Sequence, residues 1–395
     1  MKLLHKSIDE INRLGNYPRI DVLESATGPR VVIDGQEFLL FSSNNYLNFA
    51  NNARLKKAAI DAIEEYGVGS SSSRIVSGTN KLHVQLENEI AEFKEKEDAI
   101  VMTSGYSANI SMIPVLANSF SIYGKKINTK TVIFFDALSH ASILDGIKLS
   151  GVKAVRYKHC DIKHLEHLLA KYEDSRKLII TDTIFSMDGD IAPLDKIVEL
   201  KKKYGALILI DEAHATGTIG NCGRGVANFY KVTDEIDIIM GTFSKAVGSI
   251  GAYITSNKDI IKLLRVAIRG NVFSTALPPG DIAVSLEAIK MMRNSSGMVD
   301  KLHSKADYLR SNLHKIGYST MNSQTQIVPI MIGDFMKALS FQYELRKRKI
   351  IAPCIQWPAV ARDMSRIRFS LNTLHTQEDI DILVSACDEI KKEDI

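Results

Sequence analysis

The segment Ala206-Leu207-Ile208-Leu209-Ile210-Asp211-Glu212-Ala213-His214 decides the fold. Its first five residues form an apolar run that is too short for a core helix and too uniformly apolar for a half-exposed strand. Such a run is typical of a strand that is buried on both faces of a parallel sheet. Asp211 and His214 follow the run directly. Ligands of such sheets bind next to the carboxyl ends of the strands, so both residues are candidate site residues.

Four similar runs lie on either side of this segment, and stretches with helical spacing separate them. The runs are Ala99–Thr103, Thr131–Phe135, Leu178–Thr183 and Ile236–Gly241. This alternation predicts an α/β fold with a mostly parallel central sheet that helices cover on both faces.

Small, polar or ionisable residues follow each of the five runs. They are Ser104-Gly105-Tyr106-Ser107, Asp136-Ala137-Leu138-Ser139-His140, Ser186-Met187-Asp188-Gly189-Asp190, Asp211-Glu212-Ala213-His214 and Thr242-Phe243-Ser244-Lys245. Each segment alone is more typical of a turn or a helix cap. The carboxyl ends of parallel strands share one edge of the sheet, so we expect the five segments to meet there.

Together these segments match the needs of one cofactor, pyridoxal 5′-phosphate (PLP). PLP requires a lysine that forms a Schiff base, and Lys245 fits this role. It requires a carboxylate opposite its pyridinium nitrogen, and Asp211 fits. His140 and His214 fit the stacking partner of the ring and the donor to its phenolic oxygen. For the phosphate, which binds hydroxyls and the amides of a helix N-terminus, the candidates are Ser104, Gly105, Tyr106, Thr242 and Ser244.

Length and composition are those of an ordinary globular protein of more than one domain. The chain has 395 residues, of which 45% are hydrophobic and 24% are charged, and its net charge is only +4. This charge is too small for the basic surface that nucleic acids require, so no nucleic-acid partner is expected. We expect an N-terminal arm over residues 1–45, a large cofactor domain over 46–285 and a smaller α+β C-terminal domain over 286–395.

Cysteine spacing and hydropathy point to a cytoplasmic location. The four cysteines are scattered without a C-x-x-C pair, so neither a disulfide framework nor a metal site is expected. No apolar stretch approaches the length of a membrane span, and the N-terminus lacks the apolar region of a signal peptide.

A nucleotide-dependent motor is the strongest rival interpretation, because residues 207–214 read as a Walker-B strand with a DEAH box. That chemistry needs a phosphate loop of the form G-x-x-x-x-G-K-[ST], and the sequence has none. A dinucleotide site is also disfavoured, because Ser72 replaces the third glycine of the string that begins at Gly67. The G-x-S-x-G string of serine hydrolases and the H-E-x-x-H string of zinc proteases do not occur.

From about Pro29 to Ile382 the sequence resembles the α-oxoamine synthases, a PLP-dependent family of fold type I, the fold of aspartate aminotransferase. Long and specific strings carry the resemblance. They are Ser42-Ser43-Asn44-Asn45-Tyr46-Leu47, Gly69–Arg74 with Ser77-Gly78-Thr79, His83 with Leu86-Glu87, Ser139-His140-Ala141-Ser142, Phe185–Asp190, Asp211–Gly217, Gly241–Lys245, Phe273–Pro279 and Ile367-Arg368-Phe369-Ser370.

The resemblance implies a role for each matched residue. Lys245 would form the Schiff base, Asp211 and His214 would contact the pyridine nitrogen and the phenolic oxygen, and His140 would stack on the ring beside Ser186. The residues implied for substrate binding are Asn45, Arg74 and Arg368, with Arg368 taking the amino-acid carboxylate. Ser274 and Thr275 would reach the phosphate of a neighbouring subunit, which implies a homodimer with shared sites.

The family condenses a small amino acid with an acyl-CoA or acyl-carrier thioester and releases CO₂. Its members use alanine with a pimeloyl thioester, glycine with acetyl-CoA or succinyl-CoA, or serine with a palmitoyl thioester. The segments around Asn45 and Arg74 most resemble the pimeloyl branch. Phe243-Ser244 before the lysine is closer to the serine-palmitoyl branch, and residues 356–360 also depart from the pimeloyl pattern.

Overall fold

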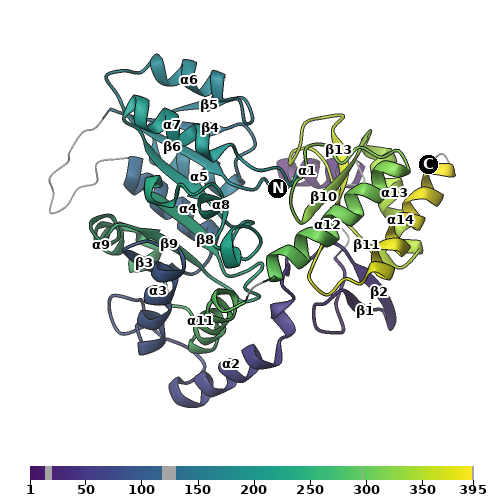
Figure 1. Cartoon of the computed structure of the whole chain (residues 1–395), viewed down its shortest axis with the longest axis horizontal. Helices are drawn as coiled ribbons and strands as arrows, with labels where there is room; N and C mark the ends of the chain where they lie inside the picture. The colour runs from purple at the N-terminus through teal and green to yellow at the C-terminus, as the bar shows by residue number, and fades with distance from the viewer. Residues whose placement is uncertain (14–19, 118–129, 296, 394–395) are drawn as a thin grey trace.

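The computed structural model describes residues 1–13, 20–117, 130–295 and 297–393, which form a larger and a smaller α/β unit side by side (Figure 1). The larger unit is built on a seven-stranded sheet, and the smaller unit contains two three-stranded sheets. Among the described residues, no helix combines the length and the apolar character that a membrane-spanning segment needs.

The seven-stranded sheet is parallel except for one strand. Its order is β3 (Asp98–Met102), β9 (Ala252–Ser256), β8 (Ile238–Thr242), β7 (Leu207–Asp211), β6 (Arg176–Asp182), β4 (Thr131–Asp136) and β5 (Lys153–Tyr157). Only β9 runs antiparallel to its neighbours. All five predicted strands are present, within a few residues of their expected bounds, and β5 and β9 are additional.

Helices cover both faces of this sheet, as the apolar runs predicted. Successive side chains of a strand point to opposite faces. Accordingly, Ile208 and Ile210 belong to one buried cluster, whereas Leu209 belongs to the other. The helices of the larger unit are α2 (Ala53–Tyr66), α3 (Lys81–Phe93), α4 (Gly105–Ala117), α5 (Ala141–Ser150), α6 (Ile162–Ala170), α7 (Leu194–Tyr204), α8 (Val226–Phe229), α9 (Lys258–Ala267), α10 (Arg269–Val272) and α11 (Pro279–Arg293).

The N-terminal arm is tied to the smaller unit. It begins with α1 (Lys2–Arg13) and later forms a hairpin of β1 (Arg30–Ile33) and β2 (Gln36–Leu40). Asp34 and Gly35 both have positive φ at the turn, which is the backbone of a type I′ hairpin. Strand β2 also pairs in parallel with β11 (Ile350–Ile351), so the two ends of the chain share a sheet.

The second sheet of the smaller unit carries a site residue. It consists of β10 (Ile327–Gly333), β13 (Ser365–Ser370) and β12 (Cys354–Ile355), with β13 in the centre. Helices α12 (Met298–Lys315), α13 (Phe335–Lys347) and α14 (Gln377–Lys392) pack around it. Every residue of β13, including Arg368, is buried.

Helix α11 crosses the expected domain boundary at residue 285. It packs against α2 and α3 of the larger unit along its length. Residues 280–316 have helical spacing in the sequence, and in the structure they form two helices, α11 and α12, with α11 ending at Arg293. We therefore propose that the division between the two units lies in the connection from α11 to α12.

Candidate functional site

The site lies at the carboxyl edge of the seven-stranded sheet, where several ionisable side chains meet. Asp182 and Asp211 end the neighbouring strands β6 and β7 and pair directly in register. Lys245 follows β8, and His140 follows β4. The charges of these residues influence one another, because Asp211 and Lys245 both shift the pKa of His140. The structure thus brings together residues that are far apart in the sequence, as predicted.

Asp211 is a buried carboxylate, 4% exposed, whose two oxygen atoms are held in place. The side-chain amide of Asn109 in α4 donates to Oδ2 at 2.9 Å. The backbone amide of Ala213 donates to Oδ1, also at 2.9 Å. Asn109 also donates to Ser142 Oγ at the start of α5, so two helices fix the orientation of the carboxylate.

The amine of Lys245 has an unusually low pKa. Burial and the positive charge of Arg368 lower it, Asp211 and Asp182 oppose the shift, and together these influences bring the pKa from 10.5 to about 8. The residue as a whole is half-buried. A lysine with this pKa carries a substantial fraction of free amine near neutral pH, the form that acts as nucleophile or base.

A chain of hydrogen bonds links His214 to Arg368. The hydroxyl of Tyr46 lies 2.8 Å from Nδ1 of His214, and Arg368 Nη2 donates to the same hydroxyl at 3.3 Å and to Asn44 Oδ1 at 3.1 Å. Burial, followed by the charge of Lys245, holds the pKa of His214 well below its usual value. His214 is therefore neutral at physiological pH.

His140 presents an exposed ring to the site. Its Nδ1 lies 2.8 Å from Ser142 Oγ, and its backbone amide donates to Asp182 Oδ2 at 3.0 Å. Although the residue keeps much of its surface exposed, partial burial lowers its pKa; Asp211 raises the pKa, and the charge of Lys245 lowers it. A neutral, exposed imidazole anchored on both sides suits stacking against a flat ring.

The predicted phosphate ligands lie where β8 and the start of α4 meet. A Cβ atom at Gly105 would lie 3.7 Å from the side chain of Thr242, so these two segments are in contact. Thr242 Oγ1 lies 2.8 Å from Ser244 Oγ. Ser104 Oγ accepts from the amide of Ser107 and begins α4. The hydroxyl of Tyr106 donates to Asp145 and points to the surface.

Two predicted residues have different surroundings. Ser186 is half-buried in the loop between β6 and α7. The amide of Asn45 donates to the carbonyl of Thr27 at 3.4 Å, and its side-chain oxygen accepts from the backbone of Ala50 at 3.3 Å. Asn45 thus contacts the backbone of its own segment, whereas its neighbour Asn44 contacts Arg368.

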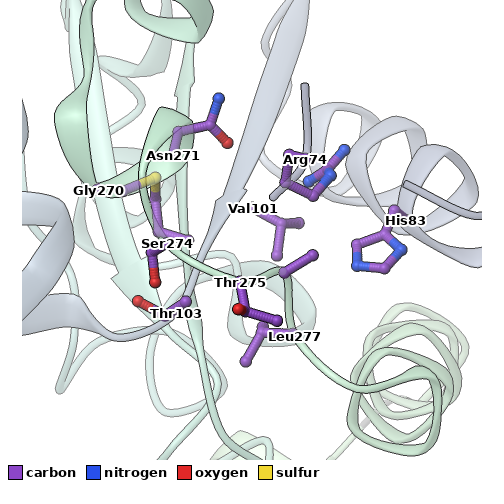
Figure 2. A pocket seen from close by; sticks show the side chains of 11 residues that line it. Arg74, His83, Val101, Thr103, Gly270, Asn271, Ser274, Thr275 and Leu277 are labelled. Carbon is purple, nitrogen blue, oxygen red and sulfur yellow. The ribbon is translucent and has the colours of Figure 1, made fainter. Parts of the chain in front are cut away.

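Arg74, Ser274 and Thr275 line a small separate cavity with His83 and Thr103 (Figure 2). Arg74 forms a buried ion pair with Glu87 at 2.9 Å and also donates to Thr79. Thr275 pairs with Ser73 through a backbone bridge. Within the described part of this single chain, no hydrogen bond or ion pair joins these three residues to Lys245 or Asp211.

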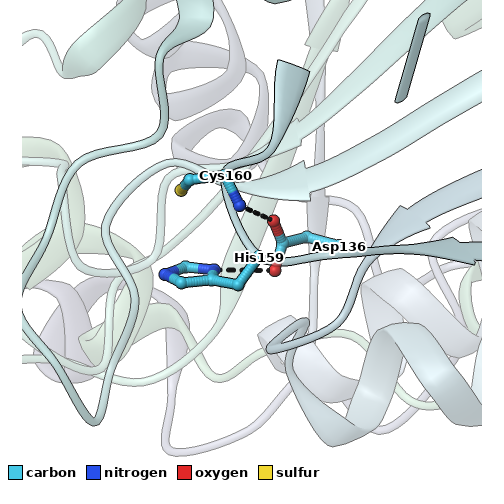
Figure 3. Close-up of side chains that lie close together, drawn as sticks. All are labelled: Asp136, His159 and Cys160. Carbon is cyan, nitrogen blue, oxygen red and sulfur yellow. Dashed lines mark hydrogen bonds and ion pairs between the residues drawn. The ribbon is translucent and has the colours of Figure 1, made fainter. Parts of the chain in front are cut away.

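Two overlapping groups of side chains could hold a metal ion: one is Asp136, His159 and Cys160 (Figure 3), and the other is His159, Asp188 and Asp190. Nδ1 of His159 lies 2.9 Å from Asp136, and Nε2 lies 2.7 Å from Asp190. Although burial opposes it, these two carboxylates raise the pKa of His159 to about 12. A protonated imidazole that bridges two aspartates accounts for the cluster.

Sequence reasoning missed four residues of the site: Asn109, Asp182, Tyr46 as a hydrogen-bonding group, and Gln326, which donates to the carbonyl of His214 at 3.0 Å. Asp182 was hidden inside an expected strand, although an aspartate in an apolar run is itself a signal. Burial and the nearby charge of Asp211 raise its pKa well above the usual value. Asn109 lies one helical turn inside α4, whereas the predicted site residues directly follow the strands.

These groups fit PLP. The structure supplies a buried carboxylate for a pyridinium, an exposed imidazole for stacking, a lysine of lowered pKa and a helix N-terminus beside hydroxyls for a phosphate. Fold and site therefore define a PLP-dependent enzyme of fold type I.

Known proteins agree with this class. The model of the family described as aminotransferase class I and II matches residues 36–386. A relative from Thermoanaerobacter pseudethanolicus named 8-amino-7-oxononanoate synthase is 40% identical, over 100% of this chain and 98% of the relative. One with the same name from Thermosipho melanesiensis is 42% identical, over 98% and 97%. The chain belongs to the aminotransferase class I and II family, and the predicted α-oxoamine synthase class is confirmed.

Solved structures of related enzymes share the fold of this chain. A serine palmitoyltransferase from Sphingomonas wittichii superposes with a TM-score of 0.91 at 30% identity, covering 99% of this chain and 97% of the other. A lysine-to-alanine variant of the enzyme from S. paucimobilis, solved with a bound PLP–myriocin aldimine, has the same TM-score at 29% identity and covers the same shares. An 8-amino-7-oxononanoate synthase from Francisella tularensis has a TM-score of 0.76 at 28% identity, covering 91% and 99%.

Proposed function

We propose that this protein is an 8-amino-7-oxononanoate synthase, which condenses alanine with a pimeloyl thioester and releases CO₂ and the free thiol carrier. One observation carries the proposal. Curated relatives of that name match essentially the whole chain at 40–42% identity. We further propose a cytoplasmic homodimer, in which Arg74, Ser274 and Thr275 of one subunit contribute to the site of the other.

The proposed cofactor contacts follow from the geometry of the site. Asp211 would hold the pyridinium nitrogen, His214 the phenolic oxygen, and His140 one face of the ring beside Ser186. For the phosphate we propose Ser104, Gly105, Tyr106, Thr242 and Ser244. Bound PLP supplies an electron sink for the negative charge that develops on the α-carbon of the amino acid.

Lys245 is the proposed base that removes the α-proton of alanine. Its pKa of about 8 leaves part of the amine unprotonated at neutral pH, and its position after β8 places it beside Asp211. The same amine, once protonated, can return the proton after CO₂ has been lost. A base whose pKa lies near the working pH serves both directions of proton transfer.

Arg368 is the proposed binding group for the alanine carboxylate. Nη2 of Arg368 is held by Asn44 and Tyr46, while Nε is buried and has no hydrogen-bond partner among the described residues. An unpaired buried donor is costly, and a carboxylate of the substrate would satisfy it. Asn45 adjoins this group, and its backbone contacts hold the segment in place.

A serine palmitoyltransferase is the second candidate. The higher TM-score to those structures and the residues Phe243 and Ser244 before the lysine favour it. Direct competition decides between the two. The holoenzyme is assayed with alanine and pimeloyl-CoA, serine and palmitoyl-CoA, and glycine and acetyl-CoA, with CoA release as the measure. We expect the first pair to give the highest kcat/KM, and a preference for either other pair overturns the proposal.

A further inference from the structure

The loop between β6 and α7 joins the larger unit to the strand that carries Arg368. Asp188 in this loop forms an ion pair with Arg366 of β13. The pair is almost completely buried, because the side chain of Arg366 is 4% exposed and that of Asp188 is 10% exposed. Arg366 also donates from Nε to the carbonyl of Met364 at 3.1 Å, which fixes the direction of its side chain.

Gly189 brings the same loop against the smaller unit. Its carbonyl accepts hydrogen bonds from the amide of Gln324 and from Thr325 Oγ1, both at 2.9 Å. A Cβ atom at this position would lie 2.1 Å from the carbonyl oxygen of Ile327, the first residue of β10. The backbones of loop and strand thus touch, which leaves little freedom for one to move without the other.

The other side of the loop is anchored in the larger unit. His159 contacts Asp136 at the end of β4 (Figure 3) and Asp190 of the loop. Its ring packs edge-on against Phe185, with 4.4 Å between the ring centroids. The loop is therefore held at Asp190 by the larger unit and at Asp188 by the smaller one. It has the contacts of a rigid joint.

Arg366 and Arg368 point to the same face of β13, because they are two residues apart on one strand. β13 is the central strand of its sheet, pairing with both β10 and β12, so it moves only together with the sheet. A restraint on Arg366 is consequently a restraint on where the guanidinium of Arg368 stands relative to Tyr46 and Lys245.

We propose that Arg366 and Asp188 form a positioning pair that places Arg368 for the amino-acid carboxylate and thereby sets the affinity for the amino acid. The inference rests on the proposed role of Arg368. A buried ion pair adds little net stability over an apolar pair of the same volume, but its geometry is directional. An ion pair with a fixed direction, from the loop between β6 and α7 to β13, can hold Arg368 in one position.

The test compares Asp188→Asn, Arg366→Gln and the double variant as holoenzymes. Affinity for alanine is measured from the absorbance change of the bound cofactor, and the KM for the acyl thioester is measured separately. We expect each single variant to raise the alanine Kd by about tenfold or more, and the double variant to lose no more than the worse single variant, since coupled residues are not additive. The thioester KM should stay within about twofold of the wild-type value.

Three further variants separate a specific effect on alanine binding from a general loss of stability. Arg348→Gln removes surface ion pairs to Glu344 and Glu389 within the smaller unit and should leave the alanine Kd unchanged. Arg366→Lys keeps the charge and serves if Arg366→Gln does not fold; a normal alanine Kd together with normal thermal stability in the lysine variant argues against placement by the guanidinium. Arg368→Ala tests the proposed function on its own.

The outcomes separate the two proposals. If Arg368→Ala weakens alanine binding while the Asp188 and Arg366 variants bind normally, the positioning pair is wrong and the proposed function stands. If Arg368→Ala binds alanine as the wild type does, the carboxylate site lies elsewhere, and both the proposed role of Arg368 and the positioning pair fall. A parallel rise in the alanine Kd and the thioester KM would indicate general distortion and would also overturn the inference.

Discussion

The amine of Lys245 lies between opposing influences. Burial and Arg368 favour its neutral form, whereas Asp211 and Asp182 favour the charged form. The outcome is a pKa of about 8, at which small changes in a neighbour's charge change the amount of free amine considerably. The pKa of Lys245 is therefore set by charges from two strands of the larger unit, β6 and β7, and from β13 of the smaller unit.

Covalent capture of PLP by the cofactor-free protein should rise with pH, with a midpoint near 8. Only the unprotonated amine attacks the aldehyde, and this form increases as the pH rises through the pKa of Lys245. Arg368→Met removes a positive charge and should move the midpoint upward. The rate is followed by the visible absorbance after mixing. A midpoint near 10.5 would show that the amine is not desolvated, and Lys245→Ala should show no covalent capture at all.

Replacement of Asp211 by asparagine should slow proton abstraction by about 10²-fold, which corresponds to about 3 kcal/mol for the loss of one key electrostatic stabiliser. The amide keeps the shape of the side chain, but it has a single acceptor oxygen, so it can keep only one of the hydrogen bonds from Asn109 and Ala213. The rate is measured as exchange of the alanine α-hydrogen in D₂O without thioester. Near-wild-type exchange would remove Asp211 from the proposed role.

At the scale of elements, the sequence predicts strands that are buried on both faces and misses the others. β5 is an edge strand with only one fully buried residue, so it lacks the continuous apolar run that marks β7. β9 is fully buried, but its sequence AYITS contains polar residues and it runs antiparallel. The hairpin at Asp34-Gly35 can be read from the sequence, because its turn chemistry is local.

The same contrast holds for the candidate site. Asp211, His140 and Lys245 follow recognisable strands, so their meeting at one edge could be predicted. Arg366 and Asp188 are joined only by the packing of one unit on the other, and no spacing in the sequence reveals that contact. Glu212 belongs to the segment that reads as a DEAH box. In the structure it is a buried ion-pair partner of Lys94, at 2.5 Å.

Gly189→Ala should lower the thermal stability far more than Gly205→Ala. Both glycines have positive φ, 71° and 60° respectively, so each alanine carries the strain of a left-handed backbone, on the order of 1 kcal/mol. At Gly189 the new Cβ also meets the carbonyl of Ile327, whereas at Gly205 it meets nothing within 4 Å. We expect a total cost of about 3 kcal/mol at Gly189. Equal shifts in Tm for the two variants would show that the loop and β10 can move apart to make room for the new methyl group.

At the scale of the whole molecule, the residues proposed to form one active site lie in two separate places on a single chain. Lys245 and Asp211 lie at the edge of the large sheet, and Arg74, Ser274 and Thr275 line another cavity (Figure 2). Several apolar side chains near the second group are exposed, among them Ile75, Val76 and Phe273. A surface of this kind fits the proposed contact between two copies of the chain.

Two inactive variants should restore partial activity when they are combined. Lys245→Ala loses the lysine, and a Ser274→Ala/Thr275→Ala chain is proposed to damage the phosphate site of its neighbour. A mixed dimer then contains one site with both defects and one site with neither, so up to about half of the activity of a wild-type dimer should return. The test uses co-expressed chains with two affinity tags. Mixed dimers that assemble but remain inactive would contradict the shared site.

The pairing of β2 with β11 has a consequence for how the chain is made. Synthesis runs from the N-terminus, and a domain generally folds once its residues have left the ribosome. The strand Gln36–Leu40 emerges early, yet its parallel partner Ile350–Ile351 is among the last segments to appear. Throughout most of translation, β2 of the hairpin therefore lacks its neighbour β11, and its backbone hydrogen-bonding groups on that edge have no partner strand. A stalled or truncated chain would display that edge, which is the feature of an unfinished sheet that invites aggregation.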